Sequence, residues 1–435
     1  AVQVGAEECG VQDSRVLLWE GHREPRLLRE IIQCDADVVC LQSMQGDVFQ
    51  RWMSGELDRL MRYGGHFVSG SGGLEELHVV GAGEEEPGVA ILFRQSCLEE
   101  LAVHTVNLFE LAAQHFPGAH LERTRMHYAK PNSGLVMVLH DRRVQQDIVV
   151  ANLQTMEHTL AHDVKLWQVH AFMCEMKRFL LKYYRGSEAV VASKPTFLCG
   201  DLASLPWSAT YLYLNGGHVP NFHPEVVEDP TEAAGGIHFD LPFPRFESAY
   251  ANTLKPHCQK VVSGLEHCPD THTIFLSSTS FRREPVFTHL GDRLRGTTDY
   301  LWFTLAQQQE SPDSSSRRHP PSWHLSLEQV LELPANPTSH SLDPILPNTH
   351  YPSAHLSLAA DFLWRKSRPL GLLRSGLTSP IPPVLKGPPT HQQGGHVEQG
   401  DVCQVSQEQG EKEEKVCGDE LHEAQSQDPQ RVKPG

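Results

Sequence analysis

A carboxylate at the end of one apolar run is the first feature of this sequence that could do chemistry. The run Thr196 to Cys199 is typical of a buried strand, and it ends at Gly200-Asp201. Because the carboxyl ends of strands in α/β proteins often carry functional groups, Asp201 is a candidate catalytic residue. A Gly-Asp pair also ends ordinary turns, so a purely structural role for Asp201 stays open.

Cysteine and histidine side chains form a second group with possible chemistry. Thiolate and imidazole are zinc ligands, but this stretch has neither the CxxC nor the HxxxH spacing of zinc sites. A histidine-rich loop is the default interpretation, and a zinc site is the alternative. The five residues are His257, Cys258, His267, Cys268 and His272. Two other cysteines, Cys40 and Cys199, lie inside apolar runs and are expected to be reduced core residues.

The elements that would position Asp201 alternate between strands and helices. Short apolar runs predict strands at residues 37–41, 89–93, 135–139, 147–152, 196–199, 297–305 and 354–364. Helical spacing of apolar residues predicts helices at residues 19–33, 49–61, 163–184 and 204–214. This alternation indicates a layered α/β domain.

Three segments lie outside this alternation. Residues 1–18 are weakly patterned, and residues 306–322 are rich in Gln, Ser and Pro, which predicts a solvated insertion. From residue 368 to 435 apolar residues become sparse and acids outnumber bases, so we predict a disordered tail. The domain is therefore expected to cover residues 19–367.

The overall composition limits the classes of partner and location. The chain has 435 residues and a net charge of −17, which opposes nonspecific binding to nucleic acid but allows a local basic groove. It contains no run of about 20 apolar residues, so no membrane span is predicted. No signal-peptide pattern follows Ala1, and the numbering can start inside a longer chain. We expect an intracellular, reducing compartment, with cytoplasm, nucleus and mitochondrion all open.

Several further motifs follow one another along the chain. They are Trp19-Glu20-x-x-Arg23, residues 35–42 (DADVVCLQ), Gly88 to Arg94, Asn132 to Val138, Asp163 to Gln168 (DVKLWQ), residues 200–211, Ser248-Ala249-Tyr250, Phe287-Thr288, Gly296-Thr297-x-Asp299-Tyr300 and Pro352-Ser353-x-His355-Leu356. In type and order they resemble the endonuclease/exonuclease/phosphatase superfamily. The pattern is most similar to the branch with the carbon-catabolite-repressor-type deadenylases, nocturnin and the Angel proteins. The resemblance implies an α-β-β-α four-layer sandwich, in which two facing β-sheets are flanked by helices.

The resemblance also implies a chemistry and some of its residues. In this superfamily a carboxylate-held Mg²⁺ neutralises a phosphoester while water attacks it. The polar positions that match the family motifs are Asp201, Asp299 and His355, with Gln154 as a partial substitute. Asp299 is implied to orient His355, although the two could also form only a buried hydrogen-bonded pair.

Other positions of the superfamily's active site are changed in this chain. Ser43 stands where the resemblance implies a metal-holding Glu, and Gln154 where it implies a phosphate-contacting His. Ala203 replaces an Asn, and Ala354 replaces an Asp. An Asn is also expected before Trp19, but the first Asn of the sequence is Asn107. Because Mg²⁺ is recruited poorly without the two metal-side carboxylates that Ser43 and Ala354 replace, no bound metal is expected.

These changes predict a catalytically degenerate protein that keeps the fold as a binding or scaffold module. Its expected partners are the proteins of an RNA-processing or ribonucleoprotein complex. RNA or a nucleotide is also expected, in a cleft near Ser43, Gln154, Asp201 and His355. The alternative is an active enzyme with altered metal ligation, either a Mg²⁺-dependent 3′–5′ exoribonuclease of the poly(A) type or a nucleotide phosphatase. A DNA-repair endonuclease of the same superfamily fits the W-x-x-R and D-V-K-x-x-Q motifs less well.

Overall fold

The computed structural model divides the chain into two units, residues 1–371 and 372–435. The structure describes residues 19–55, 57–70, 74–75, 87–116, 122–130, 132–158, 160–220, 223–226, 239–252, 284–291, 294–304, 323–334, 345–348 and 350–366, all in the first unit. Four predicted features lie outside the described residues. They are the segment 1–18, the cysteine and histidine group at 257–272, the insertion at 306–322 and the tail at 368–435.

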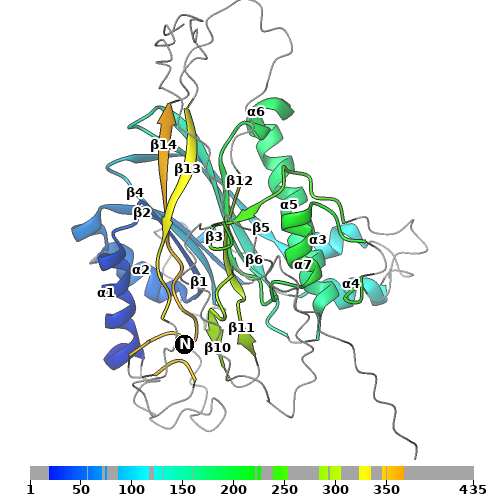
Figure 1. The fold of residues 1–435 in the computed structure, drawn as a ribbon, viewed down its shortest axis with the longest axis horizontal. Helices are drawn as coiled ribbons and strands as arrows, with labels where there is room; N and C mark the ends of the chain where they lie inside the picture. Colours follow the sequence, from blue (N-terminus) through cyan, green and yellow to red (C-terminus); the bar gives the residue numbers. More distant parts are fainter. Residues whose placement is uncertain are drawn as a thin grey trace, which may run out of the picture. The chain divides into compact units, whose positions relative to one another are not determined.

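The first sheet has four antiparallel strands in the order β1-β4-β2-β3 (Figure 1). Their bounds are β1 Val38–Met44, β2 Tyr63–Ser69, β3 Leu74–Glu75 and β4 Gly88–Arg94. The apolar side chains of β4 are fully buried because other strands flank it and both of its faces are covered. The side chains of β1 are only half-buried along most of its length.

The second sheet has six strands in the order β5-β6-β7-β8-β12-β9. Their bounds are β5 Leu98–Asn107, β6 Ser133–Asp141, β7 Gln146–Gln154, β8 Thr196–Asp201, β9 Glu247–Ser248 and β12 Asp299–Thr304. β7 and β8 are parallel, and the other neighbouring pairs are antiparallel. A parallel pair needs a long crossover, which here contains helices α5 (His162–Tyr183) and α6 (Glu188–Ala192).

The two sheets pack face to face, with helices on both outer sides. Val68 and Ile91 of the first sheet share one apolar cluster with Met137 and Val150 of the second sheet. The first sheet's outer face is covered by the π-helices η2 (Trp19–Arg23) and η3 (Leu57–Met61) and by the α-helices α1 (Glu24–Cys34) and α2 (Gly46–Ser54). The second sheet's outer face is covered by α5 together with α3 (Leu108–His115), α4 (Glu122–Tyr128) and α7 (Ala209–Gly216) (Figure 1). The predicted α-β-β-α sandwich is therefore confirmed. In the described part of the chain, no helix has both the length and the apolar character to cross a membrane.

Two small strand pairs complete the described fold. β13 (Trp323–Val330) and β14 (Ala360–Lys366) form an antiparallel pair. Phe362 of β14 packs on the second sheet, with its ring centroid 4.9 Å from that of Phe197 and 5.1 Å from that of Phe303. β10 (His289–Leu290) and β11 (Arg295–Gly296) form the other pair, next to the segment that precedes β14.

Three predicted elements differ from the structure. The helix predicted over 49–61 is split, because the chain turns at Gly55 between α2 and η3. The helix predicted from Ser204 begins at Ala209, because Ser208 is its N-cap and its side chain accepts a hydrogen bond from Tyr211 N. The last strand begins at Ala360 and not at Ala354, since the preceding segment makes only one isolated bridge, through His355.

Candidate functional site

Polar side chains gather at one edge of the second sheet. Gln154 and Asp201 are the last residues of the parallel strands β7 and β8, and they are paired in register. Asp299 is the first residue of β12, which runs antiparallel to β8, and it pairs with Asp201 from the other side. The strand register therefore places Asp201 between Gln154 and Asp299.

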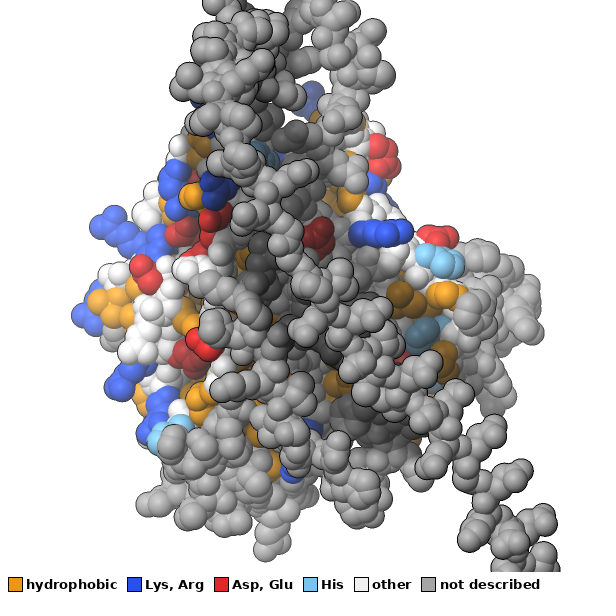
Figure 2. Space-filling model, viewed as in Figure 1, with side chains coloured by type: hydrophobic (Ala, Val, Ile, Leu, Met, Phe, Trp, Pro, Cys, Tyr) orange, Lys and Arg blue, Asp and Glu red, His pale blue; other side chains and the backbone are white. Residues whose placement is uncertain are grey.

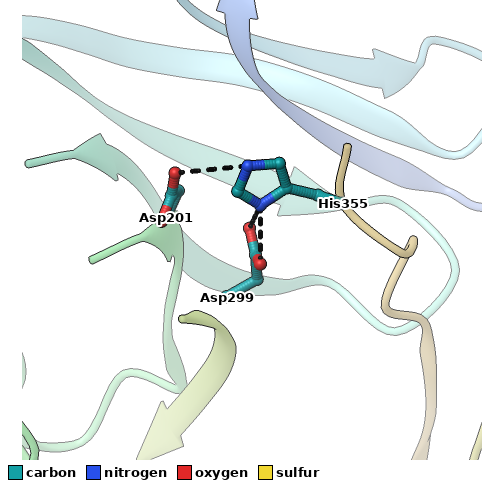
Figure 3. Close-up of side chains that lie close together, drawn as sticks. All are labelled: Asp201, Asp299 and His355. Atoms are coloured by element: carbon teal, nitrogen blue, oxygen red, sulfur yellow. Dashed lines mark hydrogen bonds and ion pairs between the residues drawn. The ribbon is translucent and has the colours of Figure 1, made fainter. Parts of the chain in front are cut away.

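His355 approaches this edge from the segment before β14. That segment is bridged to β10 through His289, and Leu356 N donates to the carbonyl of Thr288, the residue before β10, at 2.7 Å. His355 Nδ1 lies 3.0 and 2.9 Å from the two carboxylate oxygens of Asp299, and His355 Nε2 lies 4.0 Å from Asp201 Oδ2. Figure 3 shows the imidazole between the two carboxylates. The structure thus brings together all three polar residues that matched the family motifs.

The two carboxylates differ in charge because their neighbours differ. Burial and then the nearby Asp299 raise the pKa of Asp201, His355 opposes the rise, and together they bring the pKa to about 7. Burial alone would also raise the pKa of Asp299, but His355 and the hydroxyls of Thr288 and Thr298 outweigh it and lower the pKa. Near neutral pH, Asp299 is therefore ionised and Asp201 is close to its midpoint.

The same surroundings keep His355 charged. Burial favours the neutral imidazole, yet Asp299 and then Asp201 outweigh it and raise the pKa of His355 to about 9. Thr288 Oγ1 donates to Asp299 Oδ2 at 2.6 Å, which fixes the carboxylate that faces His355. The site therefore contains an imidazolium–carboxylate ion pair at neutral pH.

A second histidine, His289, lies against the first. Its ring stacks on the ring of His355, with centroids 4.3 Å apart and planes inclined by 20°. Burial, helped by the charge of His355, lowers the pKa of His289 to about 4, so it is neutral. His289 is not among the site residues predicted from the sequence. The signal for it was its position directly after the motif Phe287-Thr288.

Ser43 and Gln154 are hydrogen-bonded to each other on the side of Asp201 that is opposite Asp299. Ser43 N donates to Gln154 Oε1 at 2.9 Å, and Gln154 Nε2 donates to Ser43 Oγ at 2.7 Å. Next to them, Gln42 Nε2 donates to Asn152 Oδ1 at 2.6 Å. The end of β1 is thus tied to β7 through neutral amides and one hydroxyl.

Two further changed positions contribute only backbone atoms. Ala203 N donates to Asp201 Oδ1 at 3.0 Å, with Ala203 in the left-handed conformation at φ 43°. The carbonyl of Ala354 accepts a hydrogen bond from Leu290 N at 3.4 Å. Neither alanine offers a side-chain ligand or donor to the site.

Asp201, Asp299 and His355 are close enough to share a metal ion, since one ligand atom from each lies within 4.8 Å of the others. Two carboxylates and one imidazole suit a transition-metal ion such as Zn²⁺ or Mn²⁺. Mg²⁺ prefers an octahedron of oxygens, and Ser43 and Ala354 bring no carboxylate to build one. The residues present therefore fit a transition-metal ion better than Mg²⁺.

The sequence has relatives among known proteins, although no protein-family model matches it. It is 29% identical over 371 residues to carbon catabolite repressor protein 4 homolog 2 of Arabidopsis thaliana, covering 80% of this chain and 53% of that protein. It is 24% identical over 377 residues to the CCR4-Not complex 3′-5′-exoribonuclease subunit Ccr4 of Aspergillus niger, covering 81% of this chain and 48% of that protein. The chain spans about half the length of these curated relatives.

The fold also has a counterpart among solved structures. It is similar to the crystal structure of ANGEL2, a 2′,3′-cyclic phosphatase, in complex with adenosine-2′,3′-vanadate. The TM-score is 0.51 and the identity 22%, covering 80% of this chain and 88% of that chain. This likeness shows a shared fold. The sequence relatives confirm the predicted resemblance to carbon-catabolite-repressor-type proteins, and the shared fold agrees with it.

Proposed function

We propose that this homologue of the carbon-catabolite-repressor-type proteins is a catalytically degenerate, deadenylase-like member of its superfamily. It binds RNA or a nucleotide in the site formed by Ser43, Gln154, Asp201 and His355, and it acts as a binding or scaffold module in an intracellular RNA-processing or ribonucleoprotein complex. Two comparisons support this proposal. The Aspergillus relative is named as a subunit of a complex, and the ANGEL2 structure contains an adenosine derivative.

The reciprocal hydrogen bonds between Ser43 and Gln154 are the observation that carries the proposal. At these positions the resemblance implies a metal-holding carboxylate and a phosphate-contacting imidazole. Here the two side chains are neutral and are hydrogen-bonded to each other, so they do not compensate the dehydration of Mg²⁺ as a carboxylate would. Removing one preorganised polar group can cost about 10²–10³ in rate, and Ala203 and Ala354 also lack the implied side chains.

The remaining groups favour binding a phosphate without a metal. His355 is protonated near neutral pH, and an imidazolium forms strong charge-assisted hydrogen bonds to phosphate oxygens. Asp201 is close to its midpoint at the same pH, and its protonated form would not repel an anion. The site therefore has a cationic donor beside an acid whose charge can be removed.

Incubation of the purified full-length protein with oligo(A) RNA and with phosphorylated nucleotides, in Mg²⁺ or Mn²⁺, tests this proposal. We expect binding, measured by fluorescence anisotropy, without hydrolysis, measured on denaturing gels and by phosphate release. The control is Asp201→Ala. Metal-dependent hydrolysis that disappears in the Asp201→Ala variant would overturn the degenerate assignment.

One observation favours a second function, that of an active enzyme. Asp201, Asp299 and His355 lie within reach of a shared metal ion. In this alternative the protein is a metal-dependent 3′–5′ exoribonuclease of the poly(A) type or a nucleotide phosphatase. Because the donor set suits a transition-metal ion, this alternative predicts faster turnover with Mn²⁺ than with Mg²⁺ in the same assay.

A further inference from the structure

Two buried polar side chains of α5 are hydrogen-bonded to the loops that form the site. Lys165 is 1% exposed, and its Nζ donates to Ala203 O at 2.7 Å. Gln168, one turn later on the same face of the helix, is 0% exposed, and its Oε1 accepts from Met156 N at 2.8 Å. Ala203 follows β8 and Met156 follows β7, so both site-forming strand ends are tied to one helix.

Packing does not explain a lysine at this position. Val164, Trp167 and Phe172 of α5 already bury apolar side chains in the core against the second sheet. Burying an ammonium group is costly, and lysine is almost never fully buried without a partner. Burial lowers the pKa of Lys165, and attraction to Glu225 and Asp201 opposes this shift. A polar contact is therefore expected to offset the cost of burying this ammonium group.

That contact is made with the backbone of Ala203. The residue lies at φ 43°, a left-handed conformation that is strained for a residue with a Cβ. In this conformation its N–H donates to Asp201 Oδ1 while its carbonyl accepts from Lys165 Nζ. Both polar backbone atoms of Ala203 are thus engaged, and the carboxylate of Asp201 is fixed on the side that faces His355.

We propose that Lys165 is a positioning residue of the site, which holds the turn Asp201–Ala203 so that Asp201 faces His355. Gln168 holds the loop after Gln154 in the same way, through Met156 N. The helix α5 therefore holds the turn after β8 and the loop after β7 in place relative to each other. The identity of the ligand rests on the proposed function, whereas the position of the turn does not.

The test compares wild type, Lys165→Met and Lys165→Arg in the full-length chain. The first measurement is the amide resonance of Ala203 in protein labelled with ¹⁵N-alanine, which reports the bond to Asp201. We expect this resonance to shift in Lys165→Met and to stay near its wild-type position in Lys165→Arg, because arginine keeps a charged donor. The second measurement is calorimetric affinity for AMP, which we expect to fall about tenfold in Lys165→Met, the equivalent of one lost hydrogen bond.

The possible outcomes separate this inference from the proposed function. An Ala203 resonance and an AMP affinity unchanged in folded Lys165→Met would overturn the positioning role. If wild type does not bind AMP, the nucleotide part of the proposed function fails, while the Ala203 resonance still tests Lys165.

A second variant applies if Lys165→Met does not fold. Glycine adopts the left-handed conformation without strain, so Lys165→Met combined with Ala203→Gly is expected to fold and to bind AMP better than any folded fraction of the single variant. A double variant no better than the single one would contradict the proposal.

Discussion

At the scale of single residues, the ion pair between His355 and Asp299 makes stability depend on pH. The pKa of His355 is about 9 in the folded protein, above its ordinary value of 6.5. A base that is stronger in the folded state contributes stability that is fully present below pH 6.5 and is lost as the pH rises through 9. The carboxyl of Asp201 has its pKa raised from 3.8 to about 7. Its contribution to stability is therefore fully present below pH 3.8 and is lost as the pH rises through 7.

The first prediction concerns Asp299→Asn. Because the variant lacks the anion that faces His355 Nδ1, the pKa of His355 should fall toward or below its ordinary value. Titration of the imidazole by NMR measures this directly, and urea unfolding from pH 6 to 9 measures the linked stability. We expect the wild-type free energy of unfolding to decline over this range more steeply than that of Asp299→Asn. Equal slopes would show that the ion pair does not form.

The second prediction restores the implied ligands. A variant with Ser43→Glu, Gln154→His, Ala203→Asn and Ala354→Asp replaces the neutral pair and both alanines by groups that can hold a metal or a phosphate. We expect it to bind Mn²⁺ at least about tenfold more tightly than wild type in calorimetry, since carboxylate ligands are added. The control is Leu60→Glu, which adds a carboxylate at an exposed position of η3. An affinity raised equally in the control would mean that the gain is only general electrostatic attraction.

At the scale of elements, the close packing of β6 on α5 fixes the helix that carries Lys165. A Cβ atom at Gly134 of β6 would lie 2.2 Å from the ring of Phe172, which is fully buried on α5. The third prediction is therefore that Gly134→Ala lowers the free energy of unfolding by about 1–3 kcal/mol, the usual cost of overpacking. Urea denaturation measures it.

The matched control for Gly134→Ala is Gly21→Ala. Nothing lies within 4 Å of a Cβ atom built on Gly21, so this variant should unfold at the wild-type urea concentration. A Gly134→Ala variant that is as stable as Gly21→Ala would mean that α5 moves away from β6 at no cost.

Elements in which apolar residues dominate were predicted from the sequence, whereas strands that contain charged residues or glycines among the apolar ones were missed. The long apolar side of α5 and the runs in β7 and β8 were recognised because burial on the sheet demands such patterns. β5 was missed, since Glu99 and Glu100 interrupt its alternation on an edge strand. β2 was missed because Gly64 and Gly65 interrupt its apolar pattern.

For the candidate site too, some features were predicted from the sequence and others were not. The motifs predicted which residues would meet, and the structure brings Asp201, Asp299 and His355 together. They did not predict the bonds between Ser43 and Gln154, because such contacts depend on how the two sheets face each other. The stacking of His289 on His355 was missed because it joins segments that are far apart in the sequence.

At the scale of the whole molecule, charge limits how RNA can bind. The net charge is −17, and Figure 2 shows acidic and basic side chains interspersed over the described residues of the visible face. The main cation of the site that can meet a phosphate is His355, since Lys165 is buried and hydrogen-bonded to Ala203. Affinity for single-stranded RNA should therefore come from few phosphate contacts.

The fourth prediction follows from this charge distribution. A plot of the logarithm of the oligo(A) binding constant against the logarithm of the salt concentration should have a slope smaller in magnitude than about 2, because few counterions are released. Fluorescence anisotropy at salt concentrations from about 50 to about 200 mM measures this slope. A slope near 5 would instead require a basic groove along the RNA.

The segments that form the site also leave the ribosome at very different times. At about 5–20 residues per second, synthesis from Ser43 to His355 takes on the order of 15–60 s. Until β6 and β7 are made, the face of the first sheet that contains Val68 and Ile91 lacks the layer that buries it in the finished protein. Until His355 emerges, Asp299 lacks its ion-pair partner. A nascent chain of this protein therefore exposes an apolar sheet during translation, and its folding in the cell should depend on chaperones that protect such surfaces.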